Sequence, residues 1–299
     1  MLDKIIKFLL NKEIRFGYCD KLGLYNRLSD EDYIKKRFYT AFGYELDLNN
    51  LCTFNEKLQW IKLFDRRKMY TELVDKYLVK KYVCEKIGKD HIIPTIGVWD
   101  DPYSIDFDEL PNQFVLKCNH NSGVGMCICK DKTNLNYSLV RTNLNKGMHE
   151  NYYLRGREWP YKNVKRKIIA EKYMGDNLID YKFQCFNGKI DNILVCRNRN
   201  SSTGVEYYYF DSSWNYLPYS KQVDLKFKDF NQLKPKNLGE MINIAKILSK
   251  EIPEVRVDLY QIEDKVFFGE MTFFTQSGFD TTITSEADKI MGEHLILEN

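Results

Sequence analysis

The stretch Arg256-Val-Asp-Leu-Tyr-Gln-Ile-Glu-Asp-Lys-Val-Phe-Phe-Gly-Glu-Met-Thr272 lies near the C-terminus of this 299-residue chain. Two apolar runs flank the short polar connection 261–265, a pattern typical of a β-hairpin. In such a hairpin Asp258 and Glu270 occupy neighbouring positions on paired strands. Two adjacent carboxylates repel each other unless a cation lies between them. Mg²⁺ carrying a nucleotide is the natural cation, because it takes few protein oxygens and completes its octahedron with phosphates and water.

The composition is that of an ordinary globular protein, with 43% hydrophobic and 29% charged residues. The length suffices for one large domain or for two or three small lobes. A net charge of +3 is too small to indicate a nucleic-acid partner, so none is expected. Aromatic residues make up 14%, which suits a sugar-binding surface but is equally typical of a tyrosine-rich bacterial composition. The eight cysteines form no pair of C-x-x-C motifs, so free thiols in a reducing cytoplasm are expected.

The first ten residues are apolar but carry two lysines, and they are too short to span a membrane. One helical face would carry Leu2, Ile5, Ile6 and Leu9. This face either packs onto the protein or lies on a membrane surface. The localisation expected from it is cytoplasmic, with association at the inner face of the membrane as the sharper alternative.

The order of elements favours an α+β fold. Helices are expected from Ser29 and Thr53, both capping-box-like starts, and from near Thr71 onward. Further elements are strands at 95–99, 114–119, 126–129, 167–173, 180–186, 189–197 and 205–210, with helices around 152–155 and at 238–249.

The segment Phe114-Val-Leu-Lys117-Cys-Asn-His120-Asn-Ser122-Gly123-Val-Gly125 is a strand that ends in a lysine and continues into a small-residue loop. Such a lysine places a positive charge on a polyphosphate, while the backbone N–H groups of the loop close over the same oxygens. It is not a P-loop, because the lysine precedes the glycines. The alternative is an ordinary turn.

The segment Lys167-Ile-Ile-Ala-Glu171-Lys172-Tyr173-Met174-Gly175 is an apolar strand that ends at a polar hinge. Backbone groups at such a hinge can read the edge of an adenine, and a carboxylate can accept hydrogen bonds from ribose hydroxyls or the amino group. The alternative is a strand end with solvated charges.

In this order, the segments resemble the ATP-grasp superfamily, and more closely the TupA-like (teichuronopeptide-biosynthesis-like) ATP-grasp family of bacterial polysaccharide gene clusters. The resemblance covers the chain from about residue 30 onward. The motifs of the closer resemblance are Thr53-Phe-Asn-Glu-Lys57-Leu-Gln-Trp60, Asp75-Lys76, Leu110–His120, Arg157-Glu158-Trp159-Pro-Tyr161, Asp180-Tyr-Lys182–Gly188, and Arg256-Val-Asp258 through Ser277-Gly278-Phe279.

The resemblance implies an ATP-grasp fold in which two α+β lobes clamp ATP. It divides the chain into a helical region 1–70, an N-lobe 71–173 and a C-lobe 174–299. The residues implied for ATP are Lys76, Lys117, His120, Ser122, Gly123, Glu171, Lys172, Tyr173 and Met174. Those implied for Mg²⁺ are Asp258, Glu270 and Thr272, the last standing where the family commonly has asparagine. For Lys76 an exposed ion pair on a helix is the alternative, and Asn121 stands where the loop usually has glycine.

The activity implied is the joining of a carboxylate and an amine through an acyl phosphate, on a uronic acid or other carboxylate of a surface polysaccharide, with an amine or amino acid as the second substrate. Residues expected to take part are Arg256, Ser277, Gly278, Lys182 and Arg197. For Arg256 the alternative is a salt bridge to Asp258 or Glu270. Further acceptor residues expected are Arg157, Glu158, Trp159, Tyr161, Asp180 and Arg199. Rival functions are a glycosyltransferase using Asp106-Phe-Asp108, an ATP-grasp sugar kinase, and a degenerate nucleotide-binding module; the sequence leaves the oligomeric state open.

Overall fold

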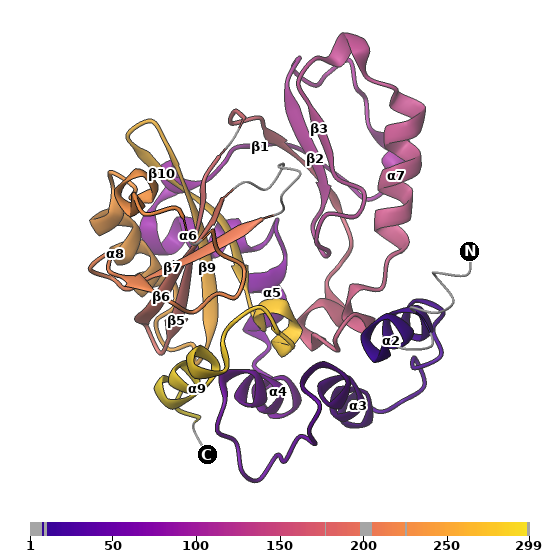
Figure 1. Cartoon of the computed structure of the whole chain (residues 1–299). Coiled ribbons are helices and arrows are strands. Elements are labelled where there is room, and N and C mark those ends of the chain that lie inside the picture. The colour runs from indigo at the N-terminus through magenta and orange to yellow at the C-terminus, as the bar shows by residue number, and fades with distance from the viewer. Residues whose placement is uncertain (1–7, 9–10, 177, 198–204, 225, 298–299) are drawn as a thin grey trace.

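The computed structural model describes residues 8, 11–176, 178–197, 205–224 and 226–297, the side chain of Arg197 excepted. Within these ranges the chain forms a small lobe, a larger lobe and a base of helices (Figure 1). The helices are α2 (Lys12–Lys21), α3 (Asp30–Phe42), α4 (Phe54–Phe64), α5 (Met69–Val74), α6 (Val79–Ile87), α7 (Tyr137–His149), α8 (Leu238–Leu248) and α9 (Ser285–His294).

The small lobe is an antiparallel sheet of four strands in the order β1-β4-β2-β3, with α7 packed beside it (Figure 1). The strands are β1 (Thr95–Trp99), β2 (Phe114–Cys118), β3 (Cys127–Cys129) and β4 (Ile168–Lys172). Val140 and Leu144 of α7 join Phe114, Leu116 and Ile168 of the sheet in one hydrophobic core.

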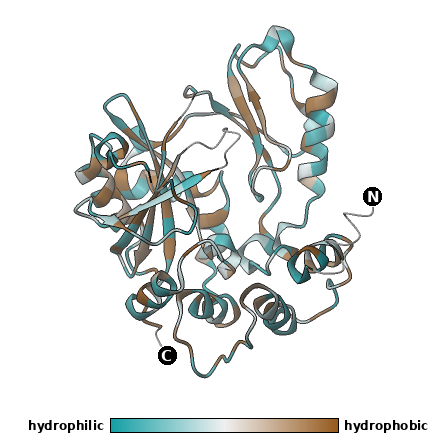
Figure 2. Cartoon of the chain, in the orientation of Figure 1, coloured by the Kyte–Doolittle hydropathy of each residue, from teal (hydrophilic) through white to brown (hydrophobic). Residues whose placement is uncertain are grey.

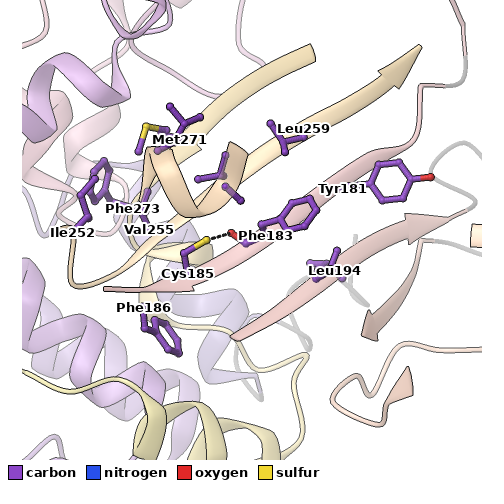
Figure 3. Packing of buried hydrophobic residues seen from close by; sticks show 14 of the residues in the cluster. Tyr181, Phe183, Cys185, Phe186, Leu194, Ile252, Val255, Leu259, Met271 and Phe273 are labelled. Carbon is purple, nitrogen blue, oxygen red and sulfur yellow. Dashed lines mark hydrogen bonds between the residues drawn. The ribbon is translucent and has the colours of Figure 1, made fainter. Parts of the chain in front are cut away.

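The large lobe is an antiparallel sheet of six strands in the order β10-β9-β5-β6-β7-β8. The strands are β5 (Asp180–Phe186), β6 (Lys189–Arg197), β7 (Glu206–Phe210), β8 (Tyr216–Leu217), β9 (Val255–Ile262) and β10 (Lys265–Thr272). Every residue of β5 is buried, and Phe183 and Cys185 pack with residues of the neighbouring strands (Figure 3). Apolar residues concentrate on the strands, and the outer faces of the helices are mostly hydrophilic (Figure 2).

The predicted α+β class and most element positions are confirmed. Ser29 accepts the N–H of Asp32 at the start of α3, and Thr53 forms a complete capping box with Glu56 at the start of α4. The helix expected from near Thr71 is interrupted, because α5 ends at Val74 and α6 begins at Val79.

The helix expected around 152–155 is wrong. The residues Tyr152–Leu154 form a single 3₁₀ turn, and the helix of this region is α7, which begins earlier. The side chain of Asn136 caps α7 by accepting the N–H of Leu139. Its buried face includes Val140 and Leu144, at the four-residue spacing of a helix.

The hydrophobic cores do not follow the three predicted ranges 1–70, 71–173 and 174–299, and this division of the chain stays a prediction. Residues of α4, α5 and α6 pack in the same core as the six-stranded sheet, although α5 and α6 fall within the range 71–173. The helices α2 and α3 form a smaller core with Phe279. The predicted apolar face at Leu2, Ile5, Ile6 and Leu9 lies outside the described residues. Within the described ranges, a helix long and apolar enough to cross a membrane is not found.

Candidate functional site

The register of the β9–β10 hairpin places Glu270 directly opposite Asp258, as the sequence predicts. The ladder is irregular between Phe268 and Glu270, at Gly269. A Cβ atom at Gly269 would lie 2.7 Å from the ring of Tyr260, so a side chain there would push that ring aside. Such an irregularity changes the direction in which the following side chains point, as β-bulges beside functional sites do.

Asp258 is buried between two cations. Its side chain is 1% exposed, and the guanidinium of Arg256 donates to both carboxylate oxygens at 2.6 and 2.7 Å. Lys182, opposite Asp258 in the register of β5 and β9, donates to Asp258 and lies 2.6 Å from Asp180. The alternative interpretation of Arg256, a salt bridge to Asp258, is therefore seen in the structure.

Glu270 is the accessible carboxylate of the pair, with 38% of its side chain exposed. Arg256 and Lys76 each lie 3.6 Å from it, and the hydroxyl of Thr272 donates to it at 3.3 Å. Burial opposes ionisation, but the charges of Lys76, Lys182, Arg256 and Lys117 outweigh it and lower the pKa of Glu270 to about 2. Glu270 is thus an anion at any physiological pH.

Lys76 joins the two lobes. Its backbone N–H donates to the carbonyl of Asn119 at 3.1 Å, and its ammonium donates to the carbonyl of Asn121 at 2.8 Å, both in the loop after β2. Lys76 lies in the turn between α5 and α6. Asp75 stabilises this turn, because its carboxylate accepts hydrogen bonds from the N–H groups of Tyr77 and Leu78. The alternative interpretation of Lys76, an exposed ion pair on a helix, is therefore wrong, because its side chain is only 14% exposed.

Lys117, the lysine at the end of β2, lies 2.5 Å from Glu171. The other oxygen of Glu171 lies 2.6 Å from Lys80, a residue of α6 that the sequence analysis missed. Burial raises the pKa of Glu171, but the two lysines outweigh this and lower it. The structure therefore shows Glu171 as the counter-ion of the predicted phosphate lysine, with both oxygens engaged.

The loop after β2 divides into a buried root and an exposed tip. Ser122 and Gly123 are exposed, and Gly123 has a left-handed φ of +80° with open space around it. Asn121 donates from its side chain to the carbonyls of Val124 and Gly147. His120 lies in the root, 3.3 Å from the carbonyl of Glu150, and burial lowers its pKa to about 4. His120 is thus neutral and sits below the part of the loop that a phosphate would meet.

The hinge after β4 borders a mainly apolar hollow of about 490 Å³. Lys172 and Tyr173 line it together with Pro94 and Ile96, and the N–H of Lys172 donates to the carbonyl of Pro94. Met174 follows at the same end of the sheet and is partly exposed.

The turn Thr275–Gly278 carries the predicted residues Ser277 and Gly278. Gln276, Ser277 and Gly278 all have positive φ, which is uncommon for residues other than glycine. The buried ammonium of Lys62 donates to the carbonyls of Ser277 and Gly156 at 2.6 and 2.7 Å. This turn is therefore fixed by α4, a connection that the sequence analysis missed.

Lys62 and its neighbours form a buried polar cluster. Gln59 accepts from Lys62 at 2.9 Å and donates to the carbonyl of Gly278, while the hydroxyl of Ser277 donates to Glu158 at 2.6 Å. Burial lowers the pKa of Lys62 and raises the pKa of Glu158. A lysine four residues after Leu58, on the apolar face of a helix, is the signal that marks Lys62.

With this geometry in place, comparison with known proteins decides the family. A sequence model of the TupA-like ATP-grasp family matches residues 56–296. The chain belongs to the TupA-like ATP-grasp family. The match begins at Glu56, so α2 and α3 lie outside it. None of the curated proteins searched matches the chain.

Solved structures similar to this TupA-like protein include ligases. A D-alanine–D-alanine ligase from Bacillus anthracis, complexed with ATP, has 17% identity and a TM-score of 0.42, with 75% of this chain and 63% of that chain covered. The enzyme of the same name from Helicobacter pylori has 13% identity and a TM-score of 0.42, with 81% and 69% covered. The ATP-grasp ligase PsnB, complexed with a minimal precursor, has 8% identity and a TM-score of 0.39, with 76% and 61% covered. This chain thus spans less than two thirds of the length of the first of these structures.

Several predicted acceptor residues of the TupA-like protein have other roles. Arg157 is buried, lies over the ring of Tyr33 and donates to the carbonyl of Tyr25. Trp159 is buried against Tyr70, so neither residue faces a substrate. The side chain of Arg197 and the whole of Arg199 lie outside the described residues.

The motif Asp106-Phe-Asp108 does not form the metal site of a glycosyltransferase. The side chain of Asp106 accepts the N–H of Asp108 in a turn, and Phe107 is buried in the core of the small lobe. Asp106 and Asp108 are both exposed on either side of that phenylalanine.

The ATP-grasp family implies Mg²⁺, and the oxygen donors beside Glu270 suit a nucleotide-bound ion. Among the described residues, no three His, Cys, Asp or Glu side chains converge as a metal cage. Mg²⁺ with a polyphosphate needs only one or two carboxylates, however. Glu270 and the hydroxyl of Thr272 are adjacent and partly exposed, whereas Asp258 must give up a contact with Arg256 or Lys182 to act as a ligand.

The buried carboxyl of Glu254 gives the fold a pH dependence. Burial raises its pKa from 4.5 to about 7, although Gln184 and the N–H of Phe274 donate to it. The folded protein therefore keeps a proton that the unfolded chain loses between pH 4.5 and 7, so this stabilisation is complete below pH 4.5 and lost as the pH rises to 7. We expect the unfolding free energy of the wild type to fall by about 2–3 kcal/mol more than that of Glu254→Gln between pH 4.5 and 8, measured by urea unfolding. Parallel pH profiles of the two proteins would contradict the assignment.

Proposed function

We propose that this chain is a Mg²⁺/ATP-dependent ligase that forms an amide between a carboxylate and an amine through an acyl phosphate. The carboxylate belongs to a uronic acid or another acidic group of a bacterial surface polysaccharide, such as a capsule, an O-antigen or a teichuronic-type polymer. The amine is an amino acid or another small amine. The observation that carries the proposal is Lys76, which contacts the loop after β2 and also lies 3.6 Å from Glu270.

In the first step, an oxygen of the substrate carboxylate attacks the γ-phosphorus of ATP, and the bond to the β-phosphate oxygen breaks to release ADP. Lys76 and Lys117 hold the polyphosphate, and the backbone at Ser122 and Gly123 closes over it. Arg256 stabilises the charge on the transferring group, a role supported by its 3.6 Å approach to Glu270. Bound Mg²⁺ would be held by Glu270 and Asp258 and would offset the charge of the triphosphate.

In the second step, the amine nitrogen attacks the acyl carbon, the bond to the phosphate oxygen breaks and phosphate leaves. Lys182 and the turn Thr275–Gly278 stabilise the oxyanion of the tetrahedral intermediate. Before this attack the substrate ammonium gives a proton to Glu158, whose pKa burial has raised, and the neutral amine that results carries the lone pair that attacks. Glu158 is tied to this turn, because it accepts a hydrogen bond from the hydroxyl of Ser277.

The first test is ATP binding by calorimetry, with and without Mg²⁺. We expect Mg²⁺-dependent binding by the wild type and a 10- to 100-fold weaker affinity in Lys117→Met, because about 1.5–3 kcal/mol of charge-assisted contact is lost. Lys130→Met is the matched control, since Lys130 is exposed and pairs with Asp176 beyond the loop. Failure of the folded wild type to bind ATP would refute the proposal.

The product of turnover separates the proposal from its rivals. Incubation with ATP, uronic acids and amino acids is expected to release phosphate and form an amide. A phosphorylated sugar would identify a kinase instead, and a nucleoside diphosphate released from a nucleotide sugar would identify a transferase. We propose that the reaction takes place in the cytoplasm, where ATP and polysaccharide precursors meet, with the inner face of the membrane as the alternative location.

A further inference from the structure

The outward face of α2 carries apolar side chains, although the solvent side of a surface helix is normally polar. Ile14, Tyr18 and Leu22 follow one another at intervals of four residues and so form one strip along the helix. Tyr18 is 50% exposed and Leu22 is 74% exposed. The opposite face attaches α2 to the protein, because the buried Phe16 packs against the ring of Tyr33 of α3. Figure 1 shows α2 at the outer end of the base of helices.

A further exposed leucine, Leu24, follows in a fixed turn. Gly23 has a left-handed φ of +74°, and its N–H donates to the carbonyl of Asp20 at 2.8 Å. The N–H of Leu24 donates to the carbonyl of Cys19 at 3.0 Å, which completes a Schellman motif. The residue after the glycine of this motif frequently packs against the last helical turn, but Leu24 is 65% exposed. Hydrogen bonds therefore hold Leu24 in a position where its side chain meets solvent.

The exposed charged side chains of this segment are basic. Within residues 11–28 they are Lys12, Arg15, Lys21 and Arg27. Arg15 and Lys21 stand three residues before and three residues after Tyr18, so each lies within one helical turn of the apolar strip.

The two acidic residues of the same segment bond to α3 instead. Glu13 pairs with Arg37 at 2.5 Å, and Asp20 accepts a hydrogen bond from the hydroxyl of Tyr33 at 3.0 Å. The helix α2 thus directs its carboxylates toward α3 and leaves a positive charge on its outward side.

The acidic first turn of α3 is compensated in part by other side chains of the base. Glu31 pairs with Lys35 at 2.6 Å, and Asp30 lies 3.5 Å from Arg66. These cations come from α3 itself and from the segment after α4, so the basic side chains of α2 are not used for this purpose.

The binding partner that suits this face combines an apolar phase with negative charge. An anionic lipid surface has both, because its acyl chains lie directly beneath its phosphates. A second copy of the chain, bound through the same face, would bring the basic side chains of the two copies together. The first ten residues carry two lysines and one aspartate, so they do not supply the negative charge either.

We propose that the outward face of α2 and the turn after it dock onto an anionic lipid surface. Tyr18, Leu22 and Leu24 enter the boundary between headgroups and acyl chains, and Arg15 and Lys21 contact the phosphates. This docking does not depend on the ligase function, and it gives a role to a helix that precedes the family match at 56–296. Because only one short helix takes part, the association is weak and reversible.

Sedimentation of the full chain with lipid vesicles, without ATP, tests the proposal. We expect binding to an equimolar mixture of phosphatidylcholine and phosphatidylglycerol, no binding to phosphatidylcholine alone, and weaker binding as the salt concentration rises. Leu22→Gln is expected to weaken binding about tenfold, because one leucine no longer enters an apolar phase. Lys21→Gln is expected to weaken it about fivefold, the effect of one basic residue near an anionic surface.

Leu139→Gln and Lys146→Gln are the matched controls, because both residues are exposed on α7. Each is expected to bind the mixed vesicles like the wild type, and circular dichroism shows that every variant is folded. Equal binding by Leu22→Gln and Leu139→Gln, or no binding by the wild type, would overturn the proposal. Analytical ultracentrifugation tests the other occupant: self-association that Leu22→Gln abolishes would assign this face to a second copy of the chain and refute the lipid contact.

Discussion

Replacing Glu270 by glutamine is expected to lower ATP-dependent turnover by about 10²–10³-fold, the usual cost of removing one preorganised electrostatic group from a reaction centre. Glu270 is the partly exposed carboxylate of the hairpin, and four cations hold it ionised, namely Lys76, Lys182, Arg256 and Lys117. The amide keeps the size of the side chain but removes the negative charge that a nucleotide-bound Mg²⁺ requires.

The measurement is phosphate release at saturating ATP, together with ATP affinity with and without Mg²⁺. We expect the Mg²⁺-dependent part of the affinity to disappear in Glu270→Gln, while binding of ATP alone persists. Glu263→Gln is the matched control, since Glu263 lies exposed in the turn of the same hairpin. Unchanged turnover in Glu270→Gln would remove this carboxylate from the mechanism.

Replacing Lys62 by methionine is expected to destabilise the folded protein by about 3–5 kcal/mol. The ammonium donates to two carbonyls and to Gln59 in a site with no exposure, and its positive charge lowers the pKa of the buried Glu158, against the effect of burial. Methionine fills the space but removes the donor to the carbonyl of Gly156 and to the side-chain oxygen of Gln59, and each buried unsatisfied group costs about 1–3 kcal/mol.

Urea unfolding of Lys62→Met against Lys68→Met tests this, because Lys68 is an exposed lysine six residues further along the chain. A second readout separates positioning from stability. In the fraction that remains folded, kcat is expected to fall while the affinity for ATP is retained, because Lys62 orients the turn at Ser277 rather than the nucleotide. Equal stability of the two variants would show that the buried ammonium contributes little.

The residues that the sequence predicts best are those fixed by local geometry. The pairing of Asp258 with Glu270 follows from two apolar runs and a short turn, and β9 and β10 have that register. The family resemblance adds Lys76 and Lys117, and the structure brings Lys76 to the hairpin while Lys117 contributes to the charge around Glu270.

The residues that the sequence analysis missed depend on contacts between distant segments. Lys62 of α4 donates to the carbonyl of Ser277, which lies 215 positions further along the chain. Lys80 of α6 forms an ion pair with Glu171 of β4. The local sequence around these two lysines is like that around exposed lysines, except that they lie on the buried face of a helix. Trp159 shows the converse error, because an aromatic beside charged residues suggests a sugar platform but packs against Tyr70 in the core.

The double attachment of Lys76 has a mechanical consequence. Its backbone and its ammonium are both tied to the loop of the small lobe, yet it supplies part of the positive charge around Glu270 in the large lobe. Because α5 and α6, which flank Lys76, pack in the core of the six-stranded sheet, a rotation that separates the lobes leaves this charge beside Glu270 and breaks the two hydrogen bonds to the loop. These two hydrogen bonds of a single lysine therefore oppose the opening of the molecule.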